Sequence, residues 1–169
     1  MSDAAHSHPE IDSGDFRHVL GHFPTGVTVV TSAGEPGSGC PAGVAIGSFA
    51  SISLDPPLVG FFLGTSSGSW PAIEASGHFC VNVLCDDQQE LCGLMASRSE
   101  DKFEGLDYET SGTGAPILPG VHAVIDCLID GVVPAGDHNL IVGRVQSLST
   151  RRDHPPMVFY KGQYGSFAG

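Results

Sequence analysis

The chain has 169 residues, 41% of them hydrophobic, which favours a single domain with one core. Seven basic residues against 19 acidic ones give a formal net charge of -12. Such a surface repels phosphate backbones and anionic lipids, so we expect neither nucleic acid nor a membrane surface as a partner. The five cysteines form no C-x-x-C pair and follow no signal-peptide pattern. We therefore expect reduced thiols in a cytoplasmic protein, with no disulfide framework and no metal site. Residues 1–12 are predicted to be a disordered tail, and 13–169 a single domain.

The first predicted element is a short helix that follows Asp12, a good N-cap residue. Apolar side chains recur there at i, i+3, i+4 and i+7, which gives one apolar face, and Pro24 is expected to end the helix. The apolar face comprises Phe16, Val19, Leu20 and Phe23.

Runs of apolar and β-branched residues, separated by Gly, Pro and Asp, predict roughly seven strands. Two more short helices are expected, one over 70–75 and one capped by Asp86, whereas 98–120 is expected to have little regular structure. No G-x-G-x-x-G follows a strand, so an antiparallel barrel is favoured over a parallel nucleotide-binding sheet. The predicted strands are 26–31, 40–48, 58–63, 79–84, 121–133, 140–148 and 156–160.

Small hydroxyl residues gather in three segments, at 24–26, 45–53 and 65–70. Gly and Ser there let backbone approach a flat or phosphorylated ligand, and hydroxyls and amides donate hydrogen bonds without adding charge. Composition alone favours a hairpin and two turns at these places, because Gly and Ser are common turn residues.

Six short motifs, in order along the chain, resemble those of the short-chain flavin reductase family. They are FRHVLGHFPTGVTVV at 16–30, SFASISLDPP at 48–57, FCVNVL at 79–84, DKF at 101–103, GDH at 136–138, and the closing aromatic pattern with Tyr160 and Tyr164. The resemblance covers nearly the whole chain.

The resemblance implies a mainly β fold with short flanking helices, an antiparallel split β-barrel that forms a homodimer. It implies an NAD(P)H:flavin oxidoreductase that transfers hydride from NADH or NADPH to FMN or FAD, with FMN preferred, and supplies reduced flavin to a partner monooxygenase. Two alternatives stay open. One is a flavoenzyme with a fixed flavin and another acceptor; the other is a flavin- or haem-binding barrel without turnover.

The resemblance also implies site residues. His138 is expected beside the nicotinamide as the catalytic residue, although a plain turn residue is the alternative, and Trp70 could equally be a core anchor. Many relatives carry Asn at Gly47, and Arg or Lys at Gly64 or Thr65, so these departures predict loose flavin binding. The flavin residues are Thr25, Ala45, Ile46, Gly47, Ser48 and Ser51 toward the ring, and Ser66, Ser67, Ser69, Trp70, Lys102 and Phe103 toward the phosphate; the nicotinamide residues are His138, Tyr160 and Tyr164.

Overall fold

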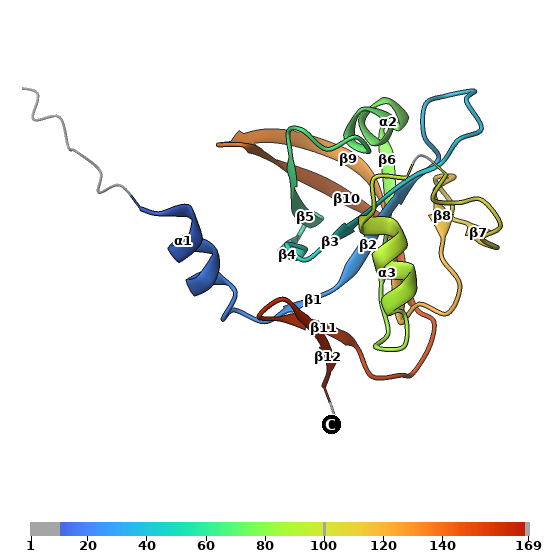
Figure 1. Ribbon diagram of the computed structural model, residues 1–169. Helices are drawn as coiled ribbons and strands as arrows, with labels where there is room; N and C mark the ends of the chain where they lie inside the picture. The colour runs from blue at the N-terminus through green and yellow to red at the C-terminus, as the bar shows by residue number, and fades with distance from the viewer. Residues whose placement is uncertain (1–10, 100, 168–169) are drawn as a thin grey trace, which may run out of the picture.

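The computed structural model describes residues 11–99 and 101–167, and within them the chain is mainly β with three short helices (Figure 1). The helices are α1 (Ser13–Leu20), α2 (Trp70–Ser76) and α3 (Gln89–Ala96). The strands are β1 (Thr25–Gly26), β2 (Thr28–Ser32), β3 (Ala42–Ile46), β4 (Ala50–Leu54), β5 (Pro57–Gly64), β6 (His78–Val83), β7 (Glu109–Thr110), β8 (Pro116–Ile117), β9 (Ala123–Ala135), β10 (His138–Thr150), β11 (Met157–Tyr160) and β12 (Gln163–Ser166).

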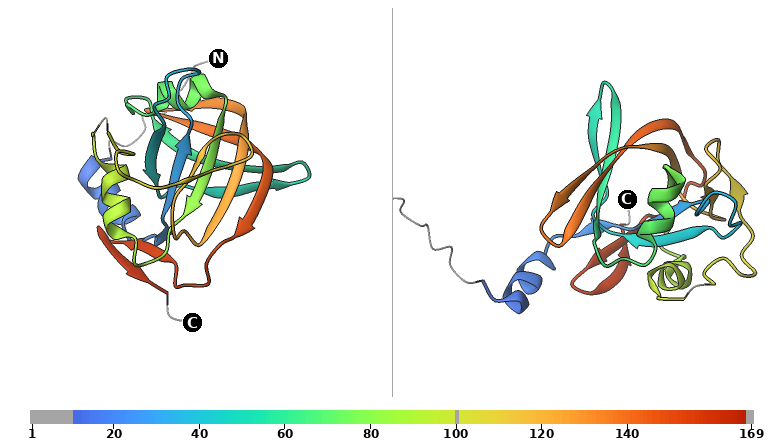
Figure 2. Two further views of the ribbon diagram at one scale, coloured as in Figure 1. Left: turned by 90° about the vertical axis from the view of Figure 1, so that its right-hand side faces the viewer. Right: turned by 90° about the horizontal axis from the view of Figure 1, so that it is seen from above.

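The main sheet has seven strands in the order β3-β2-β6-β9-β10-β5-β4, and every neighbouring pair is antiparallel. It curls strongly, so that its two ends approach each other (Figure 2). The edge strands β3 and β4 are not paired with each other, and the curled sheet is therefore split at this point. The predicted mainly β, antiparallel class is confirmed. Two small sheets, β1-β11-β12 and β7-β8, complete the described strands.

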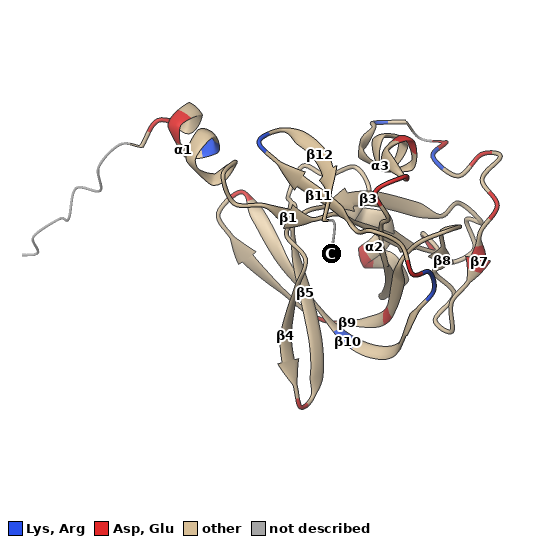
Figure 3. Ribbon diagram, turned by 90° about the horizontal axis from the view of Figure 1, so that it is seen from below, with Lys and Arg blue, Asp and Glu red and all other residues tan. Residues whose placement is uncertain are grey.

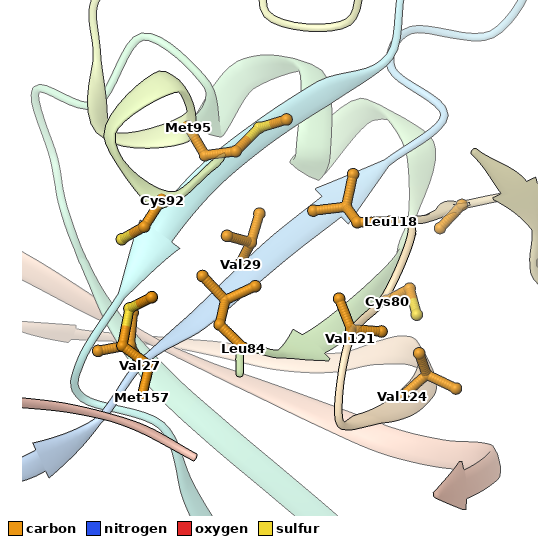
Figure 4. Close-up of a cluster of buried hydrophobic side chains, with 11 residues drawn as sticks. Val27, Val29, Cys80, Leu84, Cys92, Met95, Leu118, Val121, Val124 and Met157 are labelled. Carbon is orange, nitrogen blue, oxygen red and sulfur yellow. The ribbon is translucent and has the colours of Figure 1, made fainter. Parts of the chain in front are cut away.

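The core has two parts, one on each face of β2. This strand is buried along its whole length, which explains its β-branched composition: Val30 points into the curl and Val29 points to the opposite face. Inside the curl, Phe61 and Phe79 meet edge to face with ring centroids 5.3 Å apart. The outer cluster is covered by α3 and by the segment before β9 (Figure 4); its members include Val29, Leu84, Cys92, Met95, Leu118, Val121 and Met157.

The first helix, α1, has the predicted N-cap residue but ends earlier in the sequence than predicted. Asp12 accepts hydrogen bonds from the backbone N–H groups of Gly14 and Asp15, at 2.7 and 3.1 Å. The helix ends at Leu20, before Pro24 is reached. Of the predicted tail, residues 1–10 lie outside the described part of the chain.

The structure corrects one other local prediction and bears out two. Asp86 does not cap α3, because the helix begins after Gln88. The Asp86 carboxylate instead lies 3.1 Å from Nε2 of His154. The segment 98–120 has little regular structure, as predicted: its described residues form only the two-residue strands β7 and β8. The buried carboxylate of Asp126 accepts hydrogen bonds from the Ser111–Thr113 turn between these strands. The hydroxyl-rich segment after β3 forms the hairpin that composition favoured, with β4 paired to β5, whereas the strand β4 itself and β12 were missing from the predicted strands.

None of the described helices is long and apolar enough to cross a membrane.

Candidate functional site

The site begins where the two ends of the main sheet meet, at the turn between β3 and β4. The Ser48 hydroxyl donates to the Phe62 carbonyl at 3.1 Å and accepts from the Phe62 N–H at 2.9 Å. This side chain therefore fixes the turn to β5. The Ile46 side chain is buried in the core, so only the backbone of Ile46 is available to a ligand. Ala45 is half-buried beside it.

Thr25 and Gly47 touch at the exposed edge of this turn. A Cβ added at Gly47 would lie 3.1 Å from the Thr25 hydroxyl, which is tighter than ordinary van der Waals contact. The absence of a side chain at Gly47 thus leaves room for Thr25, which β1 holds in place by its pairing with β11. The fold brings these two predicted flavin residues together.

A second group of predicted residues converges on one backbone oxygen. The carbonyl of Gly43 accepts from the Ser69 hydroxyl at 3.0 Å and from the Lys102 ammonium at 2.9 Å. Lys102 also donates to the Met95 carbonyl at 2.9 Å, which ties the end of α3 to β3. Sequence reasoning missed Gly43; the signal was a glycine inside an apolar strand, which often marks close approach of a neighbour.

The Lys102 ammonium is buried without a carboxylate partner. The residue is 9% exposed, and among the described residues no acidic side chain forms an ion pair with it. Burial lowers its pKa, because the charged form loses hydration. Two neutral carbonyls use two of its three N–H donors. A phosphate placed beside it would supply the missing negative charge, and the donor set therefore fits a phosphorylated ligand.

The loop between β5 and α2 lies next to Lys102. Ser66 in this loop is exposed and Ser67 is half-buried, and Ser51 on β4 is exposed as well. Trp70 is buried in the inner core, which supports its reading as a core anchor. Phe103 packs against Gly43, where an added Cβ would lie 3.1 Å from its ring.

His138 stands at the other end of the same loop. It pairs across the sheet with Gly64, and a Cβ added at Gly64 would lie 3.8 Å from its Nε2. Thr65 is held by the Asp137 carbonyl, which accepts from its backbone N–H at 3.0 Å and its hydroxyl at 3.1 Å. Gly64 and Thr65 are thus both held against the β9–β10 turn.

The Asp137 side chain is a site residue that the sequence reasoning did not assign. Its carboxylate lies 2.7 Å from His138 Nδ1. The hydrogen bond from His138 lowers the pKa of Asp137, so the carboxylate stays ionised over a wider range. With Nδ1 engaged, Nε2 is the ring nitrogen on the side of Gly64.

The two tyrosines do not join His138 within one chain. Tyr160 and Tyr164 lie on the β11–β12 hairpin, which Figure 1 shows apart from the β9–β10 turn. The Tyr164 hydroxyl contacts Cys92 of α3 at 3.3 Å, and this hydrogen bond together with burial raises the pKa of Tyr164 to about 12. The Tyr160 ring lies near the segment that follows α1, with its centroid 6.5 Å from that of His22.

One further cluster lies outside this region. Asp86, Asp87 and His154 present ligand atoms within 4.8 Å of one another. Arg152 donates two hydrogen bonds to the Asp87 carboxylate, at 2.8 and 3.1 Å. The cluster is thus an ion-pair network that fastens the segment before β11 to the start of α3.

Comparison with known proteins decides the family. The model of the flavin reductase like domain matches residues 20–168. The chain belongs to this family. The reductase subunit HsaB of a flavin-dependent monooxygenase from Rhodococcus jostii is 49% identical over 162 residues, which are 96% of this chain and 82% of the relative. The NADH-dependent FMN reductase SmoA from Agrobacterium fabrum is 41% identical over 93% of this chain and 87% of its own length.

The fold agrees with that of a solved flavin reductase-family structure. Component B of nitrilotriacetate monooxygenase from Mycobacterium thermoresistibile superimposes with a TM-score of 0.87 and 46% identity, covering 92% of this chain and 86% of that one. The resemblance found in the sequence motifs is thereby confirmed at the level of family and fold.

Proposed function

We propose that this flavin reductase-family chain is an NAD(P)H:flavin oxidoreductase whose flavin phosphate binds beside Lys102. The convergence of Lys102 and Ser69 on the Gly43 carbonyl carries this proposal, because it places an unpaired buried cation next to the loop with the hydroxyls of Ser66 and Ser67. A bound flavin supplies the redox chemistry by accepting a hydride from the nicotinamide. The relatives' names, a monooxygenase reductase subunit and an NADH-dependent FMN reductase, support the same activity.

The turn between β3 and β4 forms the proposed ring site. Gly47 and Ser48 offer exposed backbone next to Thr25, and Ser48 holds this backbone rigidly against β5. A rigid backbone edge orients a flat ring with little loss of conformational freedom on binding. Ala45, Ile46 and Ser51 border this turn on β3 and β4.

His138 is proposed to orient the nicotinamide and to hold a proton at Nε2. Asp137 fixes its ring through Nδ1, so that Nε2 is directed to the loop side of β10. A carboxylate–imidazole pair of this kind fixes the orientation of the ring. Because Tyr160 and Tyr164 lie elsewhere in the chain, a role for them at the nicotinamide requires the site to be completed by a second subunit.

The absence of a basic side chain at Gly64 and Thr65 favours a flavin that is bound loosely and released. Lys102 then remains the charged anchor on the described protein for a phosphate in this loop. A released, reduced flavin suits a reductase that serves a partner monooxygenase. FMN is the preferred flavin and FAD stays open; a single charged anchor at Lys102 would suit the one phosphate of FMN.

The assembly is proposed to be a homodimer in the cytoplasm. Large apolar side chains are exposed on α1 and on the outer face of the sheet, which a stable subunit interface would cover. All five cysteines are free thiols.

The deciding experiment follows NADH and NADPH oxidation by the purified protein with no flavin, with FMN and with FAD. We expect oxidation only when flavin is added, with saturation in flavin. Oxidation by flavin retained through purification, and passed to another acceptor, would favour the fixed-flavin alternative. Flavin or haem binding without nicotinamide oxidation would contradict the proposal.

The same assay tests His138. His138→Ala is expected to lower the turnover number more than the flavin affinity. His154→Ala is the matched control, because His154 also contacts a carboxylate but lies outside the site. An unchanged turnover in His138→Ala would remove His138 from the mechanism.

A further inference from the structure

The loop between β5 and α2 connects the two proposed ligand sites. Its five residues, 65–69, start next to the strand pair that holds His138. They end at Ser69, which donates to the same Gly43 carbonyl as Lys102 does. Five residues span at most about 18 Å when fully extended, so one short segment contacts both the phosphate site and the nicotinamide site.

This loop is a series of hydrogen-bonded turns. The Ser67 N–H donates to the Gly64 carbonyl at 2.9 Å, and the Trp70 N–H donates to the Ser67 carbonyl at 3.2 Å. The Trp70 side chain is buried in the inner core and fixes the end of the loop that leads into α2. A ligand that holds Ser67 therefore also restrains Gly64 and the next residue, Thr65.

Thr65 joins this loop to the turn between β9 and β10. Its backbone N–H and its hydroxyl both donate to the Asp137 carbonyl, at 3.0 and 3.1 Å. The pairing of β10 with β5 begins at His138 and Gly64, so Thr65 stands one residue beyond the paired strands. Its two hydrogen bonds extend the attachment of β5 into the turn. Figure 3 shows this turn, with an acidic position in red, at the end of the β9–β10 hairpin.

The position of His138 depends on the same turn. The Asp137 carboxylate lies 2.7 Å from His138 Nδ1, and the His138 side chain is 48% exposed, so it is accessible to a ligand. Gly64 stands close to the other ring nitrogen, because a Cβ added there would lie 3.8 Å from Nε2. A displacement of the turn would therefore move both the carboxylate and the imidazole relative to a nicotinamide bound beside them.

We propose that Thr65 is a positioning residue that couples the binding of the flavin phosphate to the binding of the nicotinamide. The inference rests on the proposed function, which places the phosphate beside Lys102 and the nicotinamide beside His138. A phosphate bound at the loop orders it, and Thr65 passes this order to the β9–β10 turn. The second ligand then has less ordering to impose, so each ligand binds more tightly when the other is present. The factor is the same in both directions, because binding free energies are linked.

The Thr65 hydroxyl is the part of this connection that a substitution can remove. Thr65→Val deletes the hydroxyl and keeps the branched side chain and the backbone N–H. One hydrogen bond between neutral groups corresponds to about a twofold to tenfold change in an equilibrium constant. We therefore expect coupling of this size in the wild-type protein and a loss of most of it in Thr65→Val.

The experiment measures the affinities for FMN and for riboflavin by fluorescence titration, with and without saturating NAD⁺. NAD⁺ has no hydride to give, so binding is measured without turnover. We expect NAD⁺ to tighten the binding of FMN about twofold to tenfold more than that of riboflavin, which lacks the phosphate. This difference should fall toward one in Thr65→Val, and Thr65→Ser, which keeps the hydroxyl, should retain it.

Thr150→Val is the matched control. Thr150 is exposed and lies at the other end of β10 from His138, so this variant should keep the wild-type difference between FMN and riboflavin. A role of Thr65 in the fold alone would weaken the binding of both flavins equally and leave the effect of NAD⁺ unchanged.

Two results would overturn the inference. One is that NAD⁺ tightens the binding of riboflavin as much as that of FMN in the wild-type protein; the other is an unchanged difference in Thr65→Val. Either result leaves the reductase activity standing when NADH is oxidised with added flavin. Coupling that depends on Thr65 in a protein that oxidises neither NADH nor NADPH would instead contradict the proposed function and support the coupling.

Discussion

At the scale of single residues, Lys102 combines three properties that disfavour its charged form in the absence of a ligand. It is buried, it has no carboxylate partner among the described residues, and its pKa is lowered by burial. A bound phosphate would restore the ammonium toward its ordinary pKa, because an opposite charge favours the protonated form. Asp137 differs from Lys102 in that its charged side chain already has a partner within the chain, because His138 Nδ1 lies 2.7 Å from its carboxylate.

Lys102→Met is expected to lower FMN affinity by about tenfold to a hundredfold, the value of one or two hydrogen bonds to a charged group. Riboflavin, which has no phosphate, should bind both proteins equally, and fluorescence titration measures each affinity. The wild-type FMN affinity should also fall as alkaline pH removes the Lys102 proton. Lys161→Met, on the β11–β12 turn, is the control; an equal loss for riboflavin would mean that Lys102 acts on the fold alone.

At the scale of elements, the contact between β3 and α3 depends on a missing side chain. A Cβ at Gly43 would lie 2.8 Å from the Met95 sulfur and 3.1 to 3.2 Å from the Phe103 ring. The close approach of α3 lets Lys102 reach the Gly43 carbonyl. Packing of this kind positions a charged group more rigidly than a loop could.

Gly43→Ala should therefore destabilise the fold by about 1–3 kcal/mol through overpacking, and should weaken FMN binding with it. Urea unfolding and FMN titration measure the two effects. Gly131→Ala on β9 is the matched strand control, because nothing lies within 4 Å of a Cβ added there. Equal stability of the two variants would show that Met95 and Phe103 can move aside, and would contradict tight packing at β3.

At the scale of the whole molecule, two buried thiols link stability to pH. Burial raises the pKa of Cys80 and of Cys127 from 9.0 to about 12. Between those values the unfolded chain releases protons that the folded chain retains, so the free energy of unfolding falls as pH rises from 9 toward 12. Tyr164 acts in the same direction, and Lys102, whose pKa is lowered, acts in the opposite one.

The urea midpoint should accordingly decrease through this alkaline range. Cys127→Ala should flatten the dependence, whereas Cys40→Ser should leave it unchanged, because Cys40 is exposed. A midpoint that is independent of pH above 9 would show that the buried thiols ionise without unfolding.

The sequence by itself determined those features that depend on residues close together in the chain. Periodicity and turn residues placed the long strands and the Asp12 cap, and short motifs identified the family, because these patterns depend on neighbours in the chain. The same patterns gave the wrong cap for α3, because the Asp86 carboxylate pairs with His154, which is distant in sequence.

Only the tertiary structure decided which residues meet. Lys102, Ser69 and Gly43 are far apart in sequence, and their convergence on one carbonyl depends on how α3 packs against β3. The separation of Tyr160 and Tyr164 from His138 likewise follows from the pairing of β11 with β1. The exposure of α1 could not be read from its apolar stripe, because the same pattern describes a helix packed on its own core and one that reaches another subunit.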